Sequence, residues 1–406
     1  MREMKDSGVE WIGEIPEQWQ VCTVKNLCSM EAGKSLSADS IREEGLFPVY
    51  GGNGVRGFYS DYNCDGAVIL VGRQGALCGN VHITYGRIWA TEHAVITRNY
   101  SITDLKYLYY LLTAMELNQY VTTVAAQPGL AVGTIKTKKT VLPPIIEQKK
   151  IGKYLNGVCV KIYSIIKKQQ TIIEKLKEYK SSIINEAVTK GLNRNVKVKK
   201  SGYRWIEDIP EHWEMIYAKK LFAQRKDRAY DTDEQLTSSQ KYGIISQKTF
   251  MELEGRQVMQ VLKGEEILKH VEKGDFVISM RSFQGGLEYS KVTGKISSAY
   301  VMLIPNQGFV YDNYYKWLFK SKKYISALQG TSNLIRDGQA LRFSNFIQVY
   351  LPNPSIAEQK DIADYLDKKC PKIDEAISKR ISLVNKLIEY KKSLIYEVVT
   401  GKRELQ

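Results

Sequence analysis

The chain has 406 residues and carries 59 Lys and Arg against 44 Asp and Glu, a formal net charge of +15 at pH 7. This length suits two or three domains, and the basic excess favours a polyanionic partner such as nucleic acid, although many basic proteins bind none. Six scattered cysteines without a Cys-x-x-Cys pair and only four histidines argue against a zinc site. No apolar run approaches the roughly 20 residues of a membrane span, and the first residues lack a signal-peptide core, so we expect a soluble, cytoplasmic protein.

Two copies of one frame lie along the chain. Residues 7–19 match residues 201–213 at 8 of 13 positions, and residues 176–189 match residues 387–400 at 9 of 14. The offset between copies is 194 residues in the first pair and 211 in the second, so the second copy is 17 residues longer between its shared ends. A repeat of this length indicates a duplicated domain with its connector rather than a solenoid.

Residues 1–142 are predicted to form a first domain of mixed α and β structure. The runs 67–71 and 93–97 are short and β-branched, which is typical of strands. The glycines of residues 50–54 indicate a tight turn, because consecutive glycines supply the positive φ angles that turns need. Leucines and tyrosines in residues 105–120 have helical spacing.

A long helix is predicted for residues 143–192, because Pro143 and Pro144 suit a helix start and apolar residues then recur in steps of four and three. This alternation is typical of a coiled-coil seam. The predicted seam consists of Ile151, Leu155, Val158, Ile162, Ile165, Leu176, Tyr179 and Ile183.

The second copy continues with a basic linker (193–200), a second domain (201–352) and a second helical segment (353–402). We expect Pro371 to break or kink this helix, with one helix to about Lys369 and a second from Pro371 to Thr400, since proline removes a backbone donor and its ring clashes with the preceding turn. Neither seam is apolar enough to face water alone, so we expect the two helices to pack antiparallel. The second predicted seam consists of Ile373, Leu383, Leu387, Tyr390 and Leu394.

Two turns are candidates for reading bases in DNA. Arg73 and Gln74 follow a predicted strand, and Arg281 with Gln284 follows its counterpart in the second copy. Arginine pairs with guanine and glutamine with adenine in the major groove, although an exposed arginine is more often a solvated charge or holds a turn. The candidates for phosphate contacts are Lys34, Arg56, Lys136, Lys138, Lys226, Arg228, Arg336 and Arg342.

No catalytic pattern is recognisable. The chain has neither a phosphate-binding loop nor an H-E-x-x-H motif. Glu178 and Glu389 each begin a Glu-x-Lys triplet, but both triplets fall in the predicted helices and lack the strand-borne Asp of a nuclease. The duplicated tryptophans around Ile-Pro-Glu are expected to pack each domain against a helix end rather than stack on bases.

These residues resemble the specificity subunit of a type I restriction–modification enzyme. The resemblance covers essentially the whole chain and rests on the Ser-Gly-x-x-Trp-Ile-x-x-Ile-Pro-x-x-Trp openings, the Glu-Gln-Lys triplets at 147–149 and 358–360, and the two Glu-Tyr-Lys-x-Ser helices. It implies an α+β fold in which two similar target-recognition domains are separated by two long helices, packed as an antiparallel coiled coil with pseudo-twofold symmetry.

The resemblance also implies a non-catalytic subunit that binds a bipartite, asymmetric site in double-stranded DNA. Its partners would be two methyltransferase subunits and the restriction subunits, which would hold S-adenosylmethionine, ATP and Mg, with no cofactor or metal on this chain. A seam of about 26 residues spans ~39 Å at 1.5 Å per residue, comparable to one DNA turn. The alternative is a coiled-coil DNA-binding regulator or scaffold without a methyltransferase partner.

Overall fold

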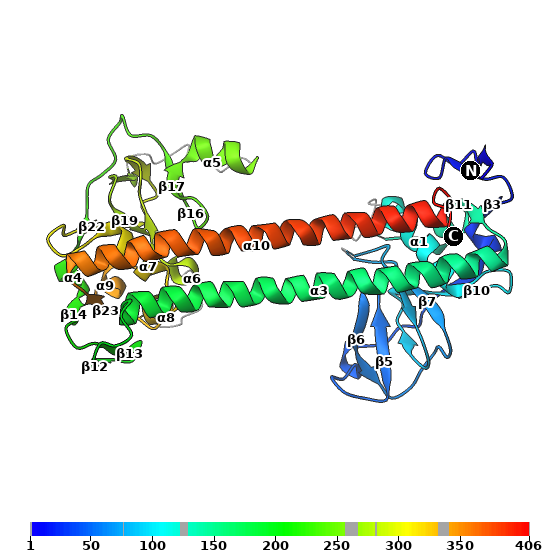
Figure 1. The fold of residues 1–406 in the computed structure, drawn as a ribbon, viewed down its shortest axis with the longest axis horizontal. Coiled ribbons are helices and arrows are strands. Elements are labelled where there is room, and N and C mark those ends of the chain that lie inside the picture. Colours follow the sequence, from blue (N-terminus) through cyan, green and yellow to red (C-terminus); the bar gives the residue numbers. More distant parts are fainter. Residues whose placement is uncertain are drawn as a thin grey trace. The chain divides into compact units, whose positions relative to one another are not determined.

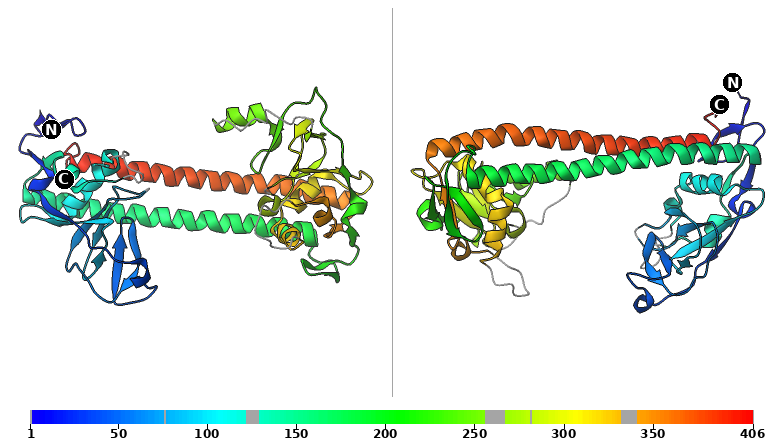
Figure 2. Two further views of the ribbon diagram at one scale, coloured as in Figure 1. Left: turned by 180° about the vertical axis from the view of Figure 1, so that it is seen from behind. Right: turned by 60° about the horizontal axis from the view of Figure 1, so that its bottom comes forward.

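The computed structural model describes residues 2–75, 77–121, 129–255, 267–280, 282–331 and 341–405. It divides into two compact units, Met1–Gln170 with Ile381–Gln406, and Thr171–Arg380. The long helices α3 (Ile145–Lys190) and α10 (Ile356–Val399) each contribute one part to either unit. Within each unit these parts of α3 and α10 lie side by side and antiparallel (Figures 1 and 2).

The first unit contains a complete α/β domain and both chain ends (Figure 1). Its strands are β1 (Met4–Asp6), β2 (Glu14–Pro16), β3 (Gln20–Thr23), β4 (Cys28–Ala32), β5 (Phe47–Gly51), β6 (Gly54–Tyr59), β7 (Val68–Gly72), β8 (Val81–Thr84), β9 (Trp89–Ala90), β10 (Ala94–Asn99) and β11 (Lys139–Leu142). Its short helices are α1 (Leu105–Ala114) and α2 (Val132–Lys136). The helix predicted over residues 105–120 therefore ends early, and Leu117–Tyr120 form a separate 3-10 turn.

The second unit repeats this plan with different insertions. Its strands are β12 (Val198–Tyr203), β13 (Ile206–Pro210), β14 (Glu214–Tyr217), β15 (Phe222–Arg225), β16 (Leu236–Ser239), β17 (Gly243–Ser246), β18 (Lys269–Val271), β19 (Phe276–Ile278), β20 (Glu288–Tyr289), β21 (Gly294–Ile296), β22 (Val301–Pro305) and β23 (Tyr350–Asn353). Its short helices are α4 (Ala218–Leu221), α5 (Gln247–Glu254), α6 (Ser282–Gly285), α7 (Asp312–Lys320), α8 (Lys322–Gln329) and α9 (Phe343–Phe346). Strand β12 begins inside the stretch predicted as a linker.

The sheet order shows that the two domains share one fold. A four-stranded antiparallel sheet has the order β4-β10-β7-β8 in the first unit and β15-β22-β19-β20 in the second. The two-stranded ladders β3-β11 and β14-β23 are also equivalent, and the last strand of each leads into a long helix. The pairs β1-β2 and β12-β13 open the two domains in the same way. The insertions differ: the first domain adds the sheet β6-β5-β9, whereas the second adds the pairs β16-β17 and β18-β21.

A buried glutamine at the start of each long helix ties that helix to its domain. Gln359 accepts a hydrogen bond from the backbone N–H of Tyr311 (2.8 Å) and donates to the carbonyls of Phe309 (2.8 Å) and Pro354 (2.9 Å). Gln148 does the same in the first unit: it accepts from the backbone N–H of Asp104 and donates to the carbonyls of Ile102 and Pro143, which precede α1 and α3. Both side chains are fully buried. The Glu-Gln-Lys triplets therefore act as structural joints.

The duplicated tryptophans are packing residues, as predicted. Trp19 and Trp213 are fully buried, and the indoles of Trp11 and Trp205 donate to backbone carbonyls of β11 and β23, at 3.1 and 3.2 Å. The copies differ at one point: Glu147 accepts a hydrogen bond from the Trp19 indole and pairs with Arg2. Its counterpart in the second unit pairs with His212, so the Trp213 indole nitrogen has no hydrogen-bond partner among the described residues.

The buried stripe of α3 follows a different period from the predicted seam. Ile151, Ile162, Ile173 and Ile184 are buried at intervals of 11 residues, which corresponds to 3.67 residues per turn. The seam was predicted at 3.5 per turn, and an ordinary helix drifts by ~20° per heptad from that register. Four heptads after Ile151 the drift reaches ~80°, so Tyr179 is 58% exposed rather than buried.

The same correction applies to other seam positions. Ile151, Leu155, Ile162, Ile183 and Leu394 are buried, and a second set is partly buried: Val158, Leu176, Ile373 and Leu387. Ile165, Leu383 and Tyr390 are exposed, like Tyr179, while Ile166 and Val384 lie inside instead. The two helices therefore pack antiparallel as predicted, but several of the residues at their contact differ from the predicted seam.

The prediction that Pro371 interrupts the second helix was wrong, because α10 continues through it. Pro371 lies on the exposed side of the helix, where solvent can satisfy the Asp367 carbonyl that loses its usual donor. On the opposite side, Leu366 and Cys370 are fully buried in the second domain. Packing against the second domain therefore offsets the free-energy cost of a proline inside the helix.

The second domain has an aromatic core and, beside it, an ion cluster centred on Arg225 and the buried Asp275. Phe222 contacts the rings of Phe276, Tyr315, Phe319 and Phe346, with centroids 5.2–5.6 Å apart. At the end of β15, the Arg225 guanidinium binds Asp275 through both a 2.7 Å and a 3.1 Å hydrogen bond. Two further carboxylates, those of Asp227 and Glu272, lie at 3.0 and 2.8 Å from it.

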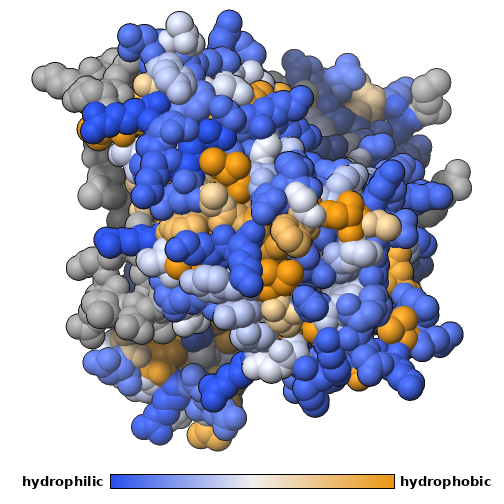
Figure 3. Space-filling view, turned by 90° about the vertical axis from the view of Figure 1, so that its left-hand side faces the viewer, coloured by the Kyte–Doolittle hydropathy of each residue, from blue (hydrophilic) through white to orange (hydrophobic). Residues whose placement is uncertain are grey.

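Hydrophilic residues cover most of the face drawn in Figure 3, where apolar side chains appear as small separate groups. Among the described residues, no helix is long and apolar enough to cross a membrane.

Candidate nucleic-acid interface

The first domain has a polar hollow where three of its chain segments meet. The turn between β5 and β6, the end of β7 and the segment before β10 surround it, with a volume of about 430 Å³. Its polar rim consists of Asn53, Arg56, Gln74 and His93. Two of these, Arg56 and Gln74, are exposed sequence-predicted contacts, so the structure brings them together on one surface.

Glycines permit the close packing that builds this hollow. A Cβ on Gly72, at the end of β7, would lie 2.1 Å from the carbonyl oxygen of Gly52. Gly54 has a φ of 106°, which favours glycine because a side chain there would be strained. The β5–β6 turn is therefore pressed against the end of β7, which fixes the distance between Arg56 and Gln74.

The backbone of Arg73 joins two loops, and a DNA contact by its side chain stays a prediction. Its backbone N–H donates to the His93 carbonyl (3.0 Å), and its carbonyl accepts from Leu130 (2.9 Å). Its side chain is half buried, and its Nε is enclosed without a hydrogen-bond partner among the described residues. Arg73 thus holds two loops together beside the more exposed Gln74.

The remaining predicted contacts are dispersed. Lys34, Lys226, Arg228, Arg342 and Gln284 are exposed. Lys136 and Lys138 are partly buried, and the Lys138 ammonium lies 4.0 Å from the ring centroid of Tyr120, a cation–π contact. Arg281 and Arg336 lie outside the described residues, and their roles stay predictions.

Sequence reasoning missed His93 and Asn53 as members of the hollow. His93 directly precedes a strand and contacts Gln74 through Nδ1. The side-chain oxygen Oδ1 of Asn53 accepts a 2.7 Å hydrogen bond from the side-chain amide of Asn80. The Gly-Gly-Asn-Gly turn could have indicated Asn53, because a turn of this kind exposes its asparagine side chain. Nothing in the sequence placed His93 beside Gln74, because 19 residues and two strands separate them.

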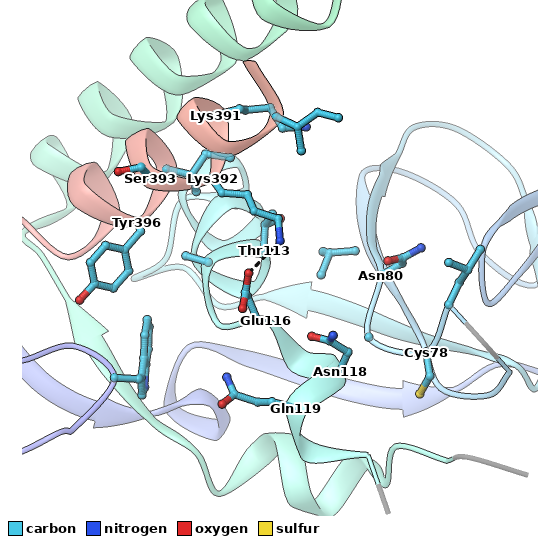
Figure 4. A pocket seen from close by; sticks show the side chains of 17 residues that line it. Cys78, Asn80, Thr113, Glu116, Asn118, Gln119, Lys391, Lys392, Ser393 and Tyr396 are labelled. Carbon is cyan, nitrogen blue, oxygen red and sulfur yellow. Dashed lines mark hydrogen bonds and ion pairs between the residues drawn. The ribbon is translucent and has the colours of Figure 1, made fainter. Parts of the chain in front are cut away.

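A second cavity, of about 680 Å³, lies between the first domain and the last turns of α10 (Figure 4). Lys392 and Glu116 form a 3.1 Å ion pair at it. Burial raises the pKa of the Cys78 thiol, so this group is not an activated nucleophile. The described residues contain no group of three His, Cys, Asp or Glu placed to hold a metal. The cavity therefore lies at the packing interface between the first domain and α10.

A duplicated domain with polar loops, mounted on two long helices, defines a modular recognition protein. The model of the type I restriction modification DNA specificity domain matches residues 16–178 and 210–383. These matches cover most of the chain, which therefore belongs to this family and is a specificity subunit with two DNA-recognition domains.

Individual relatives agree with this assignment. The EcoprrI specificity subunit of Escherichia coli is 41% identical over 138 residues, 33% of this chain and 34% of that protein. The match thus spans about a third of that relative. The MjaVIII specificity subunit of Methanocaldococcus jannaschii is 23% identical over 96% of this chain and 93% of its own length. A solved chain from work on assembly and conformational transition of the type I R-M system has the same fold, with a TM-score of 0.64 at 11% identity, covering 96% of this chain and 99% of that one.

Proposed function

We propose that this chain reads a bipartite, asymmetric site in double-stranded DNA, one half with each domain. The observation that carries the proposal is the contrast between the shared four-stranded sheets and the unlike insertions, β6-β5-β9 against β16-β17 and β18-β21. Two alike scaffolds with different surfaces suit two different half-sites. The basic excess of the chain would supply sequence-independent attraction to phosphates.

The test is selection of duplexes from a pool with a long randomised centre, using the full-length chain together with its co-purifying subunits. The proposal predicts enrichment of two short, unlike motifs at a fixed spacing. Enrichment of a single continuous motif, or of none, would overturn it.

We further propose that the long helices dock two methyltransferase subunits, and that restriction subunits join this assembly. The partners would supply S-adenosylmethionine, ATP and Mg, whereas this chain would contribute recognition and spacing. Support comes from apolar side chains left exposed on the helices, since aromatic anchors are enriched in interfaces. Tyr179 on α3 and Tyr390 on α10 occupy equivalent places in the repeat and are 58% and 50% exposed.

Replacing Tyr179 or Tyr390 with alanine is expected to weaken one methyltransferase contact each, by about 2 kcal/mol if the tyrosine is a hot spot. The measurement is the number of methyltransferase subunits bound per chain, by sedimentation at fixed concentrations. Tyr85→Ala is the matched control, because Tyr85 is an exposed tyrosine (62%) on the loop after β8. Unchanged binding in both helix variants, with folding intact, would contradict the docking proposal.

A further inference from the structure

We infer that Gln74 reads an adenine in the half-site of the first domain, and that His93 is the positioning residue that holds its amide. This inference rests on the proposed DNA-binding function and extends it to one base pair. The family assignment does not identify which side chains meet bases. The hollow beside the end of β7 supplies that evidence.

The amide of Gln74 is exposed but is not free to rotate. His93 Nδ1 contacts its Oε1, and the other ring nitrogen, Nε2, lies 3.4 Å from the Glu92 carboxylate. The ring thus contacts the Gln74 amide on one side and faces the Glu92 carboxylate on the other. A side chain held in this way loses less conformational entropy when it binds a base than a freely rotating glutamine would.

After its contact with His93, the Gln74 amide still has the donor and the acceptor that recognise adenine. A glutamine amide has two N–H donors and two acceptor lone pairs on its oxygen. The His93 contact occupies one of these four, whichever way round the amide is placed. One donor for adenine N7 and one lone pair for the adenine N6 amino group remain, and this is the pair that recognises adenine in the major groove.

The backbone under Gln74 is also fixed from several directions. Gln74 forms a β-bridge with Gly129, and the neighbouring Arg73 is bonded to His93 and Leu130. The site that a Cβ on Gly52 would occupy is 3.0 Å from the His93 carbonyl and 3.4 Å from that of Gln74. Three loops therefore converge on this residue, as a reading position requires.

The neighbours of Gln74 suit a base edge flanked by the DNA backbone. Arg56 is an exposed cation on the same rim and can contact a phosphate, while Gln74 offers both a donor and an acceptor to a base edge. Asn53 already accepts a hydrogen bond from Asn80, so its oxygen is partly used. Asn53 keeps the same donor–acceptor pair, but Gln74 has the longer side chain and a backbone fixed by the β-bridge to Gly129.

The test repeats the duplex selection with variants of the full-length chain and its co-purifying subunits. Gln74→Ala is expected to reduce the preference for adenine at one position of one half-site about 5- to 150-fold. Gln74→Glu is expected to shift that position toward cytosine, because a carboxylate only accepts and cytosine presents its N4 amino group. Misfolding cannot produce such an exchange of preference.

His93→Ala should weaken selection at the same position and should have no added effect in the Gln74→Ala background. Gln20→Ala, an exposed glutamine on β3, is the control and should change nothing. If the wild-type chain selects a split motif but Gln74→Ala and Gln74→Glu leave every position unchanged, this inference fails while the proposed function stands. If the wild type selects no split motif, the proposed function itself fails.

Discussion

Replacing Arg225 with alanine is expected to lower the stability of the second domain by about 3–5 kcal/mol, the cost of leaving a buried charge without its partner. Asp275 is 2% exposed and is bound by Arg225 through two hydrogen bonds. Without the guanidinium, the one hydrogen bond left to its carboxylate among the described residues would come from the Glu272 backbone N–H, at 3.0 Å. Hydrogen exchange resolved by peptide would show faster exchange in residues 222–225 and 276–278, because exchange reports local opening.

The control is Arg228→Ala, an exposed arginine three residues further on, for which a change within about 0.5 kcal/mol is expected. The double variant Arg225→Ala with Asp275→Ala should be less destabilised than the single arginine variant, since it removes the orphaned charge as well. Equal stability of Arg225→Ala and the wild type would show that the cluster is not a structural element.

Replacing Gln359 with alanine is expected to cost about 2–4 kcal/mol, because each buried polar group left unsatisfied costs about 1–3 kcal/mol. The variant leaves the N–H of Tyr311 and the carbonyls of Phe309 and Pro354 without their hydrogen-bond partner at the start of α10. Chemical denaturation of the full chain measures the loss.

The matched variant Gln148→Ala should act on the first unit in the same way, since its bonds repeat those of Gln359. Gln348→Ala is the control, because Gln348 is exposed and, within the described part of the chain, its side chain donates to the nearby Ser344 carbonyl alone. A loss below about 1 kcal/mol in both buried variants would contradict their assignment as joints between helix and domain.

The internal repeat made much of the fold predictable. Two matched motif sets implied two domains and two long helices, and the shared strand before Arg73 and before Arg281 is found in equivalent sheet positions, β7 and β19. Both are local patterns of hydrophobicity and turns, which a sequence displays directly. The tryptophan frames were likewise interpreted correctly as packing.

Features that depend on tertiary geometry were not predictable. The seam prediction used a heptad, and only the structure shows that the buried isoleucines of α3 recur every 11 residues. Pro371 reads as a break, but packing of Leu366 and Cys370 maintains the helix around it. Arg225 and Asp275 are 50 residues apart, and His93 lies 19 residues from Gln74, so no local pattern pairs them.

The most direct measurement is a map of methylated bases across the genome of cells with this gene intact and with it deleted. We predict one split, asymmetric motif that is methylated with the gene intact and loses this methylation on deletion. Modification of the same motifs in both strains, in cells where the methyltransferase partner is present, would contradict the claim that this chain directs the partner to DNA.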